Sequence, residues 1–219
     1  MAMTFPRILP VGDAALVVEF GDAIRPDIHR QVLALDHALA ADPFPGLRET
    51  VPTYRSLLVY YDPRQLSWDE ARRGVADALA RSTDIPMPEP REVEIPVVYG
   101  GEFGPDIGFV AAHTGLSEEE VVRLHTGVTY TVYMLGFAPG FVYLGGLPEA
   151  LATPRLPTPR PSVPAGSVGI AGLQTGIYGL STPGGWRLIG RTPLMMLDLN
   201  RQPPTLLQPG DRVRFVRIG

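Results

Sequence analysis

Residues 125–186 combine glycine, proline and aromatic side chains more densely than any other part of the chain. The segment opens with HTGVTYTVYMLGFAPGFVYLGG and closes with PRLPTPRPSVPAGSVGIAGLQTGIYGLSTPGGW. Glycine permits positive φ and close backbone approach, whereas proline fixes φ and removes a hydrogen-bond donor. Between short apolar runs, both residues predict tight corners that join short strands. Such a segment closes a small barrel or shapes a pocket, and we expect it to do both.

The residues around this segment also predict mainly β structure. Strands are expected at 93–99, 128–134, 141–144, 167–171, 186–190 and 193–199, and a last strand follows the turn Pro209–Gly210–Asp211. Two short helices, at 105–113 and 117–126, are expected to cover this β structure. A closed barrel is favoured because it leaves no exposed strand edge.

The first part of the chain has a different pattern. A strand is expected at 14–20, and SLLVYY within 49–62 is a strongly β segment. Apolar residues at helical spacing predict helices at 24–41 and 67–81. This alternation predicts a small α+β domain. The sequence IPMPEPRE at 85–92 is a stiff, proline-rich linker candidate. We therefore expect an N-terminal domain over 1–88 and a C-terminal barrel over 89–219.

Composition excludes several classes of function. All 19 basic residues are arginine and cysteine is absent, so lysine Schiff bases, P-loop lysines, thiolate chemistry and disulfides are impossible. The second of the two short helices begins SEEEVVRLH, and its three acidic residues argue against nucleic acid as a partner. No apolar run approaches the ~18 residues of a membrane span, and no signal peptide is visible. We expect a cytoplasmic protein without a membrane or nucleic-acid partner.

Few residues are candidates for chemistry, and no metal-ligand spacing or Ser-His-Asp motif is present. His125 ends a predicted helix and is a catalytic candidate, although a partner of the helix C-terminus is an equal alternative. Two arginines lie in the proline-stiffened loop PRLPTPRP, which could clamp a small anionic substrate or form an exposed arm. Backbone amides near Gly136 and Gly140 could face a ligand. Phe137, which lies between them, could line that ligand or belong to the core. The Gln174 amide and the Tyr178 phenol could donate hydrogen bonds. The substrate-binding candidates are therefore Arg155, Arg160, Gln174, Tyr178, Gly136, Phe137 and Gly140.

The long motifs of the chain resemble one protein family. HTGVTYTVYMLGFAPGFVYLGGLP, PRLPTPRPSVPAGSVGIAGLQTGIY and STPGGWRLIGRT are similar to the family of the 5-oxoprolinase B subunit, which includes Kip-type kinase inhibitors and allophanate hydrolase subunit 1. This is the family of the carboxyltransferase domain, subdomains C and D. GDAALVVEFGD, ETVPTYRSLLVYYDP and REVEIPVVYGGEFGPD extend the resemblance over nearly the whole chain. Gly179 and Thr182 depart from the usual residues without weakening it, but they leave the branch of the family open.

The resemblance implies a cyclophilin-like barrel and a place in a multi-subunit enzyme. That enzyme hydrolyses 5-oxo-L-proline to L-glutamate at the expense of ATP, with Mg²⁺. ATP is then a co-substrate of the complex and is not necessarily bound by this chain. The implied partners are a carboxyltransferase-like C subunit and an A subunit of the lactam-utilisation type, and the chain alone should be inactive. Alternatives are an inhibitor of a sensor histidine kinase and subunit 1 of an allophanate- or urea-utilising enzyme.

Overall fold

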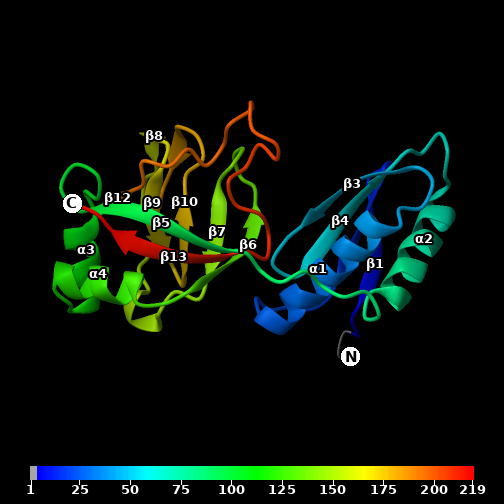
Figure 1. Cartoon of the computed structure of the whole chain (residues 1–219), viewed down its shortest axis with the longest axis horizontal. Helices are drawn as coiled ribbons and strands as arrows, with labels where there is room; N and C mark the ends of the chain where they lie inside the picture. Colours follow the sequence, from blue (N-terminus) through cyan, green and yellow to red (C-terminus); the bar gives the residue numbers. More distant parts are fainter. Residues whose placement is uncertain (1–3) are drawn as a thin grey trace. The chain divides into compact units, whose positions relative to one another are not determined.

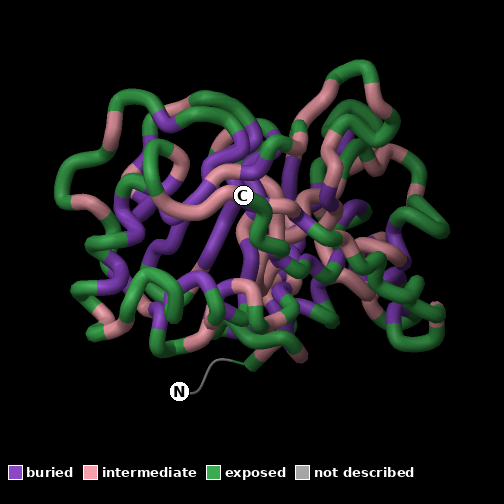
Figure 2. The backbone as a smooth tube through the Cα atoms, turned by 60° about the vertical axis from the view of Figure 1, so that its left-hand side comes forward, coloured by how far each residue is buried: buried purple, intermediate pink, exposed green. Residues whose placement is uncertain are grey.

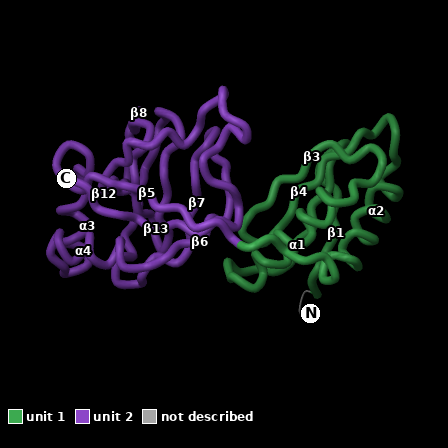
Figure 3. Tube along the Cα trace, in the orientation of Figure 1, with its two compact units in different colours: residues 1–89 green, residues 90–219 purple. Residues whose placement is uncertain are grey.

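A computed structural model describes residues 4–219. The chain divides into two compact units, residues 1–89 and residues 90–219, which differ in architecture (Figure 3). In each unit the buried segments run through the interior and the connecting loops are exposed (Figure 2). Each unit has its own hydrophobic core, so each is described by itself.

The first unit is a four-stranded antiparallel sheet with two helices on one face (Figure 1). The sheet has the order β1-β2-β4-β3, and Leu16, Val18, Leu57 and Val59 alternate with more exposed residues so that one face is buried. The apolar sides of both helices cover this face. The elements are β1 (Arg7–Val11), β2 (Ala15–Glu19), α1 (Pro26–Ala41), β3 (Leu47–Pro52), β4 (Ser56–Tyr61) and α2 (Trp68–Arg81).

The second unit is a closed barrel with the strand order β10-β7-β6-β13-β5-β12-β9. Antiparallel pairing of β9 with β10 closes the ring, and β13 and β5 are its parallel pair. A separate two-stranded sheet, β8 with β11, lies beside it. The elements are β5 (Glu92–Tyr99), α3 (Ile107–Thr114), α4 (Glu118–Thr126), β6 (Tyr130–Leu135), β7 (Val142–Gly145), the 3₁₀ turn η1 (Glu149–Leu151), β8 (Arg160–Val163), β9 (Ser167–Ala171), β10 (Gln174–Ile177), β11 (Thr182–Gly184), β12 (Arg187–Arg191) and β13 (Arg212–Arg217).

Helices α3 and α4 cover the barrel, as the sequence predicted. Helix α3 packs beside β12 and helix α4 beside β13, and their apolar residues Val110, Val121 and Val122 join the barrel core. Ser117 and Glu120 form the capping box that starts α4. The expected fold class, an α+β unit followed by a mainly β closed barrel, is therefore confirmed.

The strand predicted at 193–199 is wrong. The residues between β12 and β13 form turns with one isolated bridge, Leu197 to Thr205. The Arg201 guanidinium donates to the backbone carbonyls of Met196 and Pro204, so a side chain rather than a strand partner satisfies this loop. The short strands β8, β10 and β11 were not predicted, because each has only three or four residues and contains proline or glycine.

Within residues 4–219, no helix is both long and apolar enough to cross a membrane. The same part of the chain contains no cluster of three or more histidine, aspartate or glutamate side chains suited to a metal ion.

Candidate functional site

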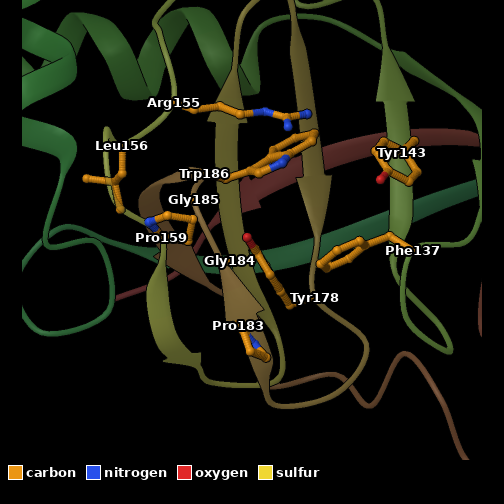
Figure 4. A pocket seen from close by; sticks show the side chains of 10 residues that line it. All are labelled: Phe137, Tyr143, Arg155, Leu156, Pro159, Tyr178, Pro183, Gly184, Gly185 and Trp186. Atoms are coloured by element: carbon orange, nitrogen blue, oxygen red, sulfur yellow. The ribbon is translucent and has the colours of Figure 1, made fainter.

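A pocket of about 330 Å³ lies on the outer surface of the barrel wall, within the glycine- and proline-rich segment. Its walls come from the β6–β7 loop, β7, the loop before β8, the end of β10 and the β11–β12 connection. Figure 4 shows Arg155 extending beside the Trp186 ring, with Phe137 and Tyr143 across from them. The lining residues are Phe137, Tyr143, Arg155, Leu156, Pro159, Tyr178, Pro183, Gly184, Gly185 and Trp186.

Side-chain alternation along the strands places aromatic residues on the outer face of the barrel. Val142 and Leu144 of β7 belong to the barrel core, so Phe141 and Tyr143 point outward. The outward residues form a second apolar cluster with the residues of the neighbouring strands and of β8. Its members are Phe141, Val163, Ala171, Tyr178, Trp186 and Leu188, with Tyr143 packed against them. The pocket therefore has a rigid aromatic floor.

Two glycines make room for Trp186. Gly176 and Gly169 are opposite each other in the β9–β10 pairing. A Cβ on Gly176 would lie 3.0 Å from the indole ring and 2.7 Å from the Val142 carbonyl oxygen, and a Cβ on Gly169 would lie 3.1 Å from the Trp186 Cβ. The absence of side chains here lets the indole lie flat against the sheet.

Arg155 is the one charged residue among those that line the pocket. Its guanidinium carbon is 5.8 Å from the centre of the Trp186 ring, a cation–π geometry. The residue is exposed, and none of the carboxylates in residues 4–219 forms an ion pair with it. Burial raises the pKa of the Tyr143 and Tyr178 phenols, and the nearby positive charge of Arg155 opposes this rise. Arg155 thus offers an uncompensated charge to a ligand.

Tyr178 provides a buried hydroxyl without a hydrogen-bond partner in the described chain. The residue is 0% exposed, and its hydroxyl lies near the Trp186 backbone amide without a hydrogen bond of proper geometry. Figure 4 shows the hydroxyl pointing toward Gly184 and the middle of the pocket. Burial raises the pKa of the Tyr178 phenol, so the group is a neutral donor near pH 7. A buried polar atom without a partner is costly unless a ligand or water satisfies it.

Phe137 has an unusual backbone conformation at the edge of the pocket. Its φ is 66°, and among residues 4–219 no other non-glycine residue has positive φ. Its side chain is 68% exposed and contacts the Phe141 ring edge to face. The hydrogen bond from the Gly136 amide to the Phe141 carbonyl closes the loop and holds this conformation. Strain of this kind gathers at ligand-binding sites.

His125, the catalytic candidate, is not part of the pocket. It is 0% exposed inside the barrel, and the centre of its ring lies 4.5 Å from that of Phe215, with the two planes tilted by 32°. Nδ1 lies 2.8 Å from the Tyr99 hydroxyl, and Nε2 lies 2.9 Å from Thr175 Oγ1. Burial lowers the pKa of His125 to about 3. The structure thus places His125 apart from the pocket, with both ring nitrogens engaged inside the barrel.

The hydrogen bonds of Thr175 assign the His125 tautomer. Thr175 Oγ1 donates its hydrogen to the Gly169 carbonyl, at 3.0 Å, so it accepts a hydrogen bond from Nε2–H. The Tyr99 hydroxyl then donates to Nδ1. The neutral imidazole links β5, β9 and β10, and its role is to hold the barrel together.

Arg160 also lies outside the lining of the pocket. Its Nη2 is 2.9 Å from Asp106 Oδ1, and Asp106 Oδ2 accepts a hydrogen bond from the Leu188 amide at 2.7 Å. Arg187 lies 4.0 Å from the same carboxylate and places its guanidinium 3.4 Å from the centre of the Phe109 ring. The structure thus places Arg160 apart from the pocket, where it shares the carboxylate of Asp106 with Arg187.

The remaining candidates, Gln174, Gly136 and Gly140, do not line the pocket. Gln174 begins β10 and is half-buried, and Gly136 and Gly140 shape the loop that carries Phe137. Three expected residues, Phe137, Arg155 and Tyr178, are brought together. Tyr143 and the segment Pro183–Gly185 were missed, although the alternation of Tyr143 with Val142 and Leu144 was a usable signal.

The arrangement suits recognition rather than reaction. One guanidinium without a counter-ion can pair with one carboxylate, and the aromatic walls can hold a small ring. The lining includes no carboxylate, histidine or serine that could serve as a base or nucleophile. Chemistry at this pocket therefore needs groups from outside its lining.

Comparison with known proteins gives a family and a fold. The family described as carboxyltransferase domain, subdomain C and D, matches residues 6–207. The 5-oxoprolinase B subunit of Bacillus subtilis is 50% identical over 226 residues, which cover 97% of this chain and 92% of the relative. The crystal structure of TTHA0988 superposes with a TM-score of 0.82 at 44% identity, covering 94% of this chain and 40% of that longer chain. The Kluyveromyces lactis urea carboxylase shares the fold, with a TM-score of 0.76 at 19% identity. The superposition covers 97% of this chain and 22% of the urea carboxylase chain.

Proposed function

The chain belongs to the family of the carboxyltransferase domain, subdomain C and D, and on that premise we propose that it is the B subunit of an ATP-dependent 5-oxoprolinase. The complex would hydrolyse the lactam of 5-oxo-L-proline to L-glutamate. The observation that carries the proposal is the 50% identity to a protein named as the B subunit of 5-oxoprolinase, along almost the full length of both chains. The matched region spans both units of the chain.

The absence of a nucleophile or base from the pocket supports a role that depends on partners. The proposed partners are the carboxyltransferase-like C subunit and the A subunit of the lactam-utilisation type. Exposed apolar side chains on adjoining loops support contact with another polypeptide: Phe137 is 68% exposed, Met195 64% and Leu199 84%. These loops meet at Gly140, where an added Cβ would lie 2.8 Å from the Leu197 Cβ. Apolar surface of this kind marks protein–protein contacts.

The residues of the pocket do not fit ATP with Mg²⁺. A triphosphate is held by several cationic groups or by amides of a glycine-rich loop, and Mg²⁺ prefers carboxylate and phosphate oxygens. The pocket supplies one guanidinium and no carboxylate. We therefore place ATP, as co-substrate of the complex, outside this pocket, and assign to this chain the binding of the anionic organic substrate.

Reconstitution tests the proposed function. The chain is co-expressed with candidate A and C subunits, and ATP hydrolysis is measured with 5-oxoproline, with urea, with allophanate and without substrate. We expect hydrolysis that depends on 5-oxoproline and on all three subunits. Activity of this chain alone, or no 5-oxoproline dependence with any partner set, contradicts the proposal. Inhibition of a sensor kinase's autophosphorylation by this chain would favour the regulatory alternative.

A further inference from the structure

The pocket carries the marks of a specific ligand site. It has one positive charge without an internal counter-ion, at Arg155, and one fully buried donor without an acceptor, at Tyr178. It also has a strained, exposed aromatic residue at its edge, Phe137. These three features arise on different loops; the buried Tyr178 hydroxyl and the positive φ of Phe137 each cost stability, and the exposed Arg155 charge is free to pair with an anion. A single ligand could compensate for all of them.

We propose that this pocket binds a small ring that carries one carboxylate. The Arg155 guanidinium pairs with the carboxylate, the Tyr178 hydroxyl donates a hydrogen bond to an oxygen of the ligand, and the ring lies among the aromatic walls. In the proposed complex this ligand is 5-oxoproline. That identity rests on the proposed function, whereas the class of ligand rests on the pocket alone.

The position of Arg155 favours a carboxylate. Pro154 and Pro157 flank the Arg155–Leu156 pair and restrict the backbone, so less entropy is lost when the side chain is fixed. The guanidinium lies over the Trp186 ring at a cation–π distance and forms no ion pair within residues 4–219, so its N–H groups are available to a ligand. A carboxylate can accept two parallel hydrogen bonds from such a guanidinium.

The size and polarity of the pocket limit the size and the charge of the ligand that can bind. A volume of about 330 Å³ admits a five- or six-membered ring with its substituents, and most of the lining is aromatic or proline. Tyr178 stays protonated near neutral pH because burial raises its pKa, so it donates to an oxygen and does not accept a proton. A lactam acid presents both a carboxylate and a carbonyl oxygen. A nucleoside triphosphate presents several negative charges to one guanidinium and is excluded.

Binding can be measured on the full chain through Trp186. The chain has two tryptophans, and Trp68 lies in the first unit, so a Trp68→Phe background leaves Trp186 as the single reporter. The probes are 5-oxoproline, its primary amide and Mg-ATP. We expect a saturable change in fluorescence with 5-oxoproline, affinity at least about tenfold weaker for the amide, which has lost the charge, and no change with Mg-ATP.

Two variants test the assigned contacts. Arg155→Met should weaken 5-oxoproline binding by at least about tenfold, and Tyr178→Phe, which keeps the ring, by about tenfold. Arg123→Met is the matched control: Arg123 is exposed on α4, outside the pocket, and its replacement should leave binding unchanged.

The outcomes separate this inference from the proposed function. Equal binding of the acid and the amide, wild-type affinity of Arg155→Met, or competition by Mg-ATP overturns the inference. So does the absence of saturable binding both in the full chain and in the reconstituted complex. An active complex with no carboxylate binding at this pocket refutes the inference alone. Carboxylate binding by a chain that supports no 5-oxoprolinase activity refutes the proposed function alone.

Discussion

The guanidinium of Arg160 and the carboxylate of Asp106 form an ion pair across the outer surface of the barrel, with Nη2 and Oδ1 2.9 Å apart. The second carboxylate oxygen accepts the hydrogen bond of the Leu188 amide at 2.7 Å. One buried carboxylate therefore ties the start of α3 and the strand β12 to β8. Because β8 pairs with β11, which lines the pocket, this contact supports the pocket from behind.

Removing the carboxylate should destabilise the barrel unit. Asp106→Ala leaves Arg160 and the Leu188 amide without their partner, and we expect the free energy of unfolding to fall by about 3 kcal/mol. Urea unfolding followed by Trp186 fluorescence measures this change. The control is Glu94→Ala, which breaks the exposed pair of Glu94 with Arg214 and should cost less than about 1 kcal/mol. A loss for Asp106→Ala of less than about 1 kcal/mol, as expected for the control, would contradict a structural role of Asp106.

His125 should make the stability of the barrel unit depend on pH. Its pKa is about 3 in the folded chain and about 6.5 when unfolded, so between these values the unfolded chain binds more protons. The contribution is complete above pH 6.5 and is lost as the pH falls, by about 1.4 kcal/mol per pH unit. In a His125→Gln variant, the free energy of unfolding should fall less steeply as the pH is lowered. Parallel pH profiles for wild type and variant, from pH 4 to 7, would contradict it.

Two neighbouring glycines provide a matched pair for the pocket. A Cβ on Gly184 would lie 2.2 Å from the Tyr178 hydroxyl oxygen, whereas a Cβ on Gly185 would lie 3.7 Å from the nearest atom, in Pro159. Gly184→Ala should displace Tyr178 and weaken 5-oxoproline binding by at least about tenfold, while Gly185→Ala should change it little. Fluorescence titration of the two variants measures the difference. Similar affinities would mean that the position of Tyr178 is not important for the ligand.

Replacing Phe137 should raise the stability of the chain and weaken its binding of the ligand. Asparagine tolerates positive φ better than phenylalanine, so Phe137→Asn should raise the free energy of unfolding by about 1 kcal/mol. The same change removes an aromatic wall and should weaken ligand binding. The control is Leu199→Asn, because Leu199 is exposed and does not have positive φ. This change should alter neither the free energy of unfolding nor ligand binding. A Phe137→Asn variant that is less stable than wild type would contradict the assignment of strain.

The sequence predicted the elements whose residues repeat with a clear period. Helix α1 and the strands β2, β4 and β6 follow from apolar spacing, and the capping boxes at Ser67 and Ser117 mark where α2 and α4 begin. The strands β8 and β11 could not be predicted in this way, because a three- or four-residue strand rich in proline and glycine has no measurable period. Their pairing joins residues far apart in the sequence, such as Val163 and Thr182.

The candidate site was predictable in part for a related reason. Arg155 could be selected from its stiff proline context, whereas its contact with Trp186 follows only from the fold. Arg160 has the same local context, and only the fold shows that it pairs with Asp106, 54 positions away. His125 likewise has a sequence position compatible with chemistry, and only the closed barrel shows that Tyr99 and Thr175 enclose it. Long-range pairing and burial are properties of the fold that local pattern does not contain.

The most direct measurement is the steady-state kinetics of the reconstituted complex with Arg155→Met in this chain. If Arg155 holds the organic anion and ATP binds elsewhere, only the organic substrate should lose affinity. We therefore predict that KM for 5-oxoproline rises by at least about tenfold, while KM for ATP stays within about twofold of wild type. Unchanged values of both constants, or a rise in KM for ATP alone, would contradict this assignment.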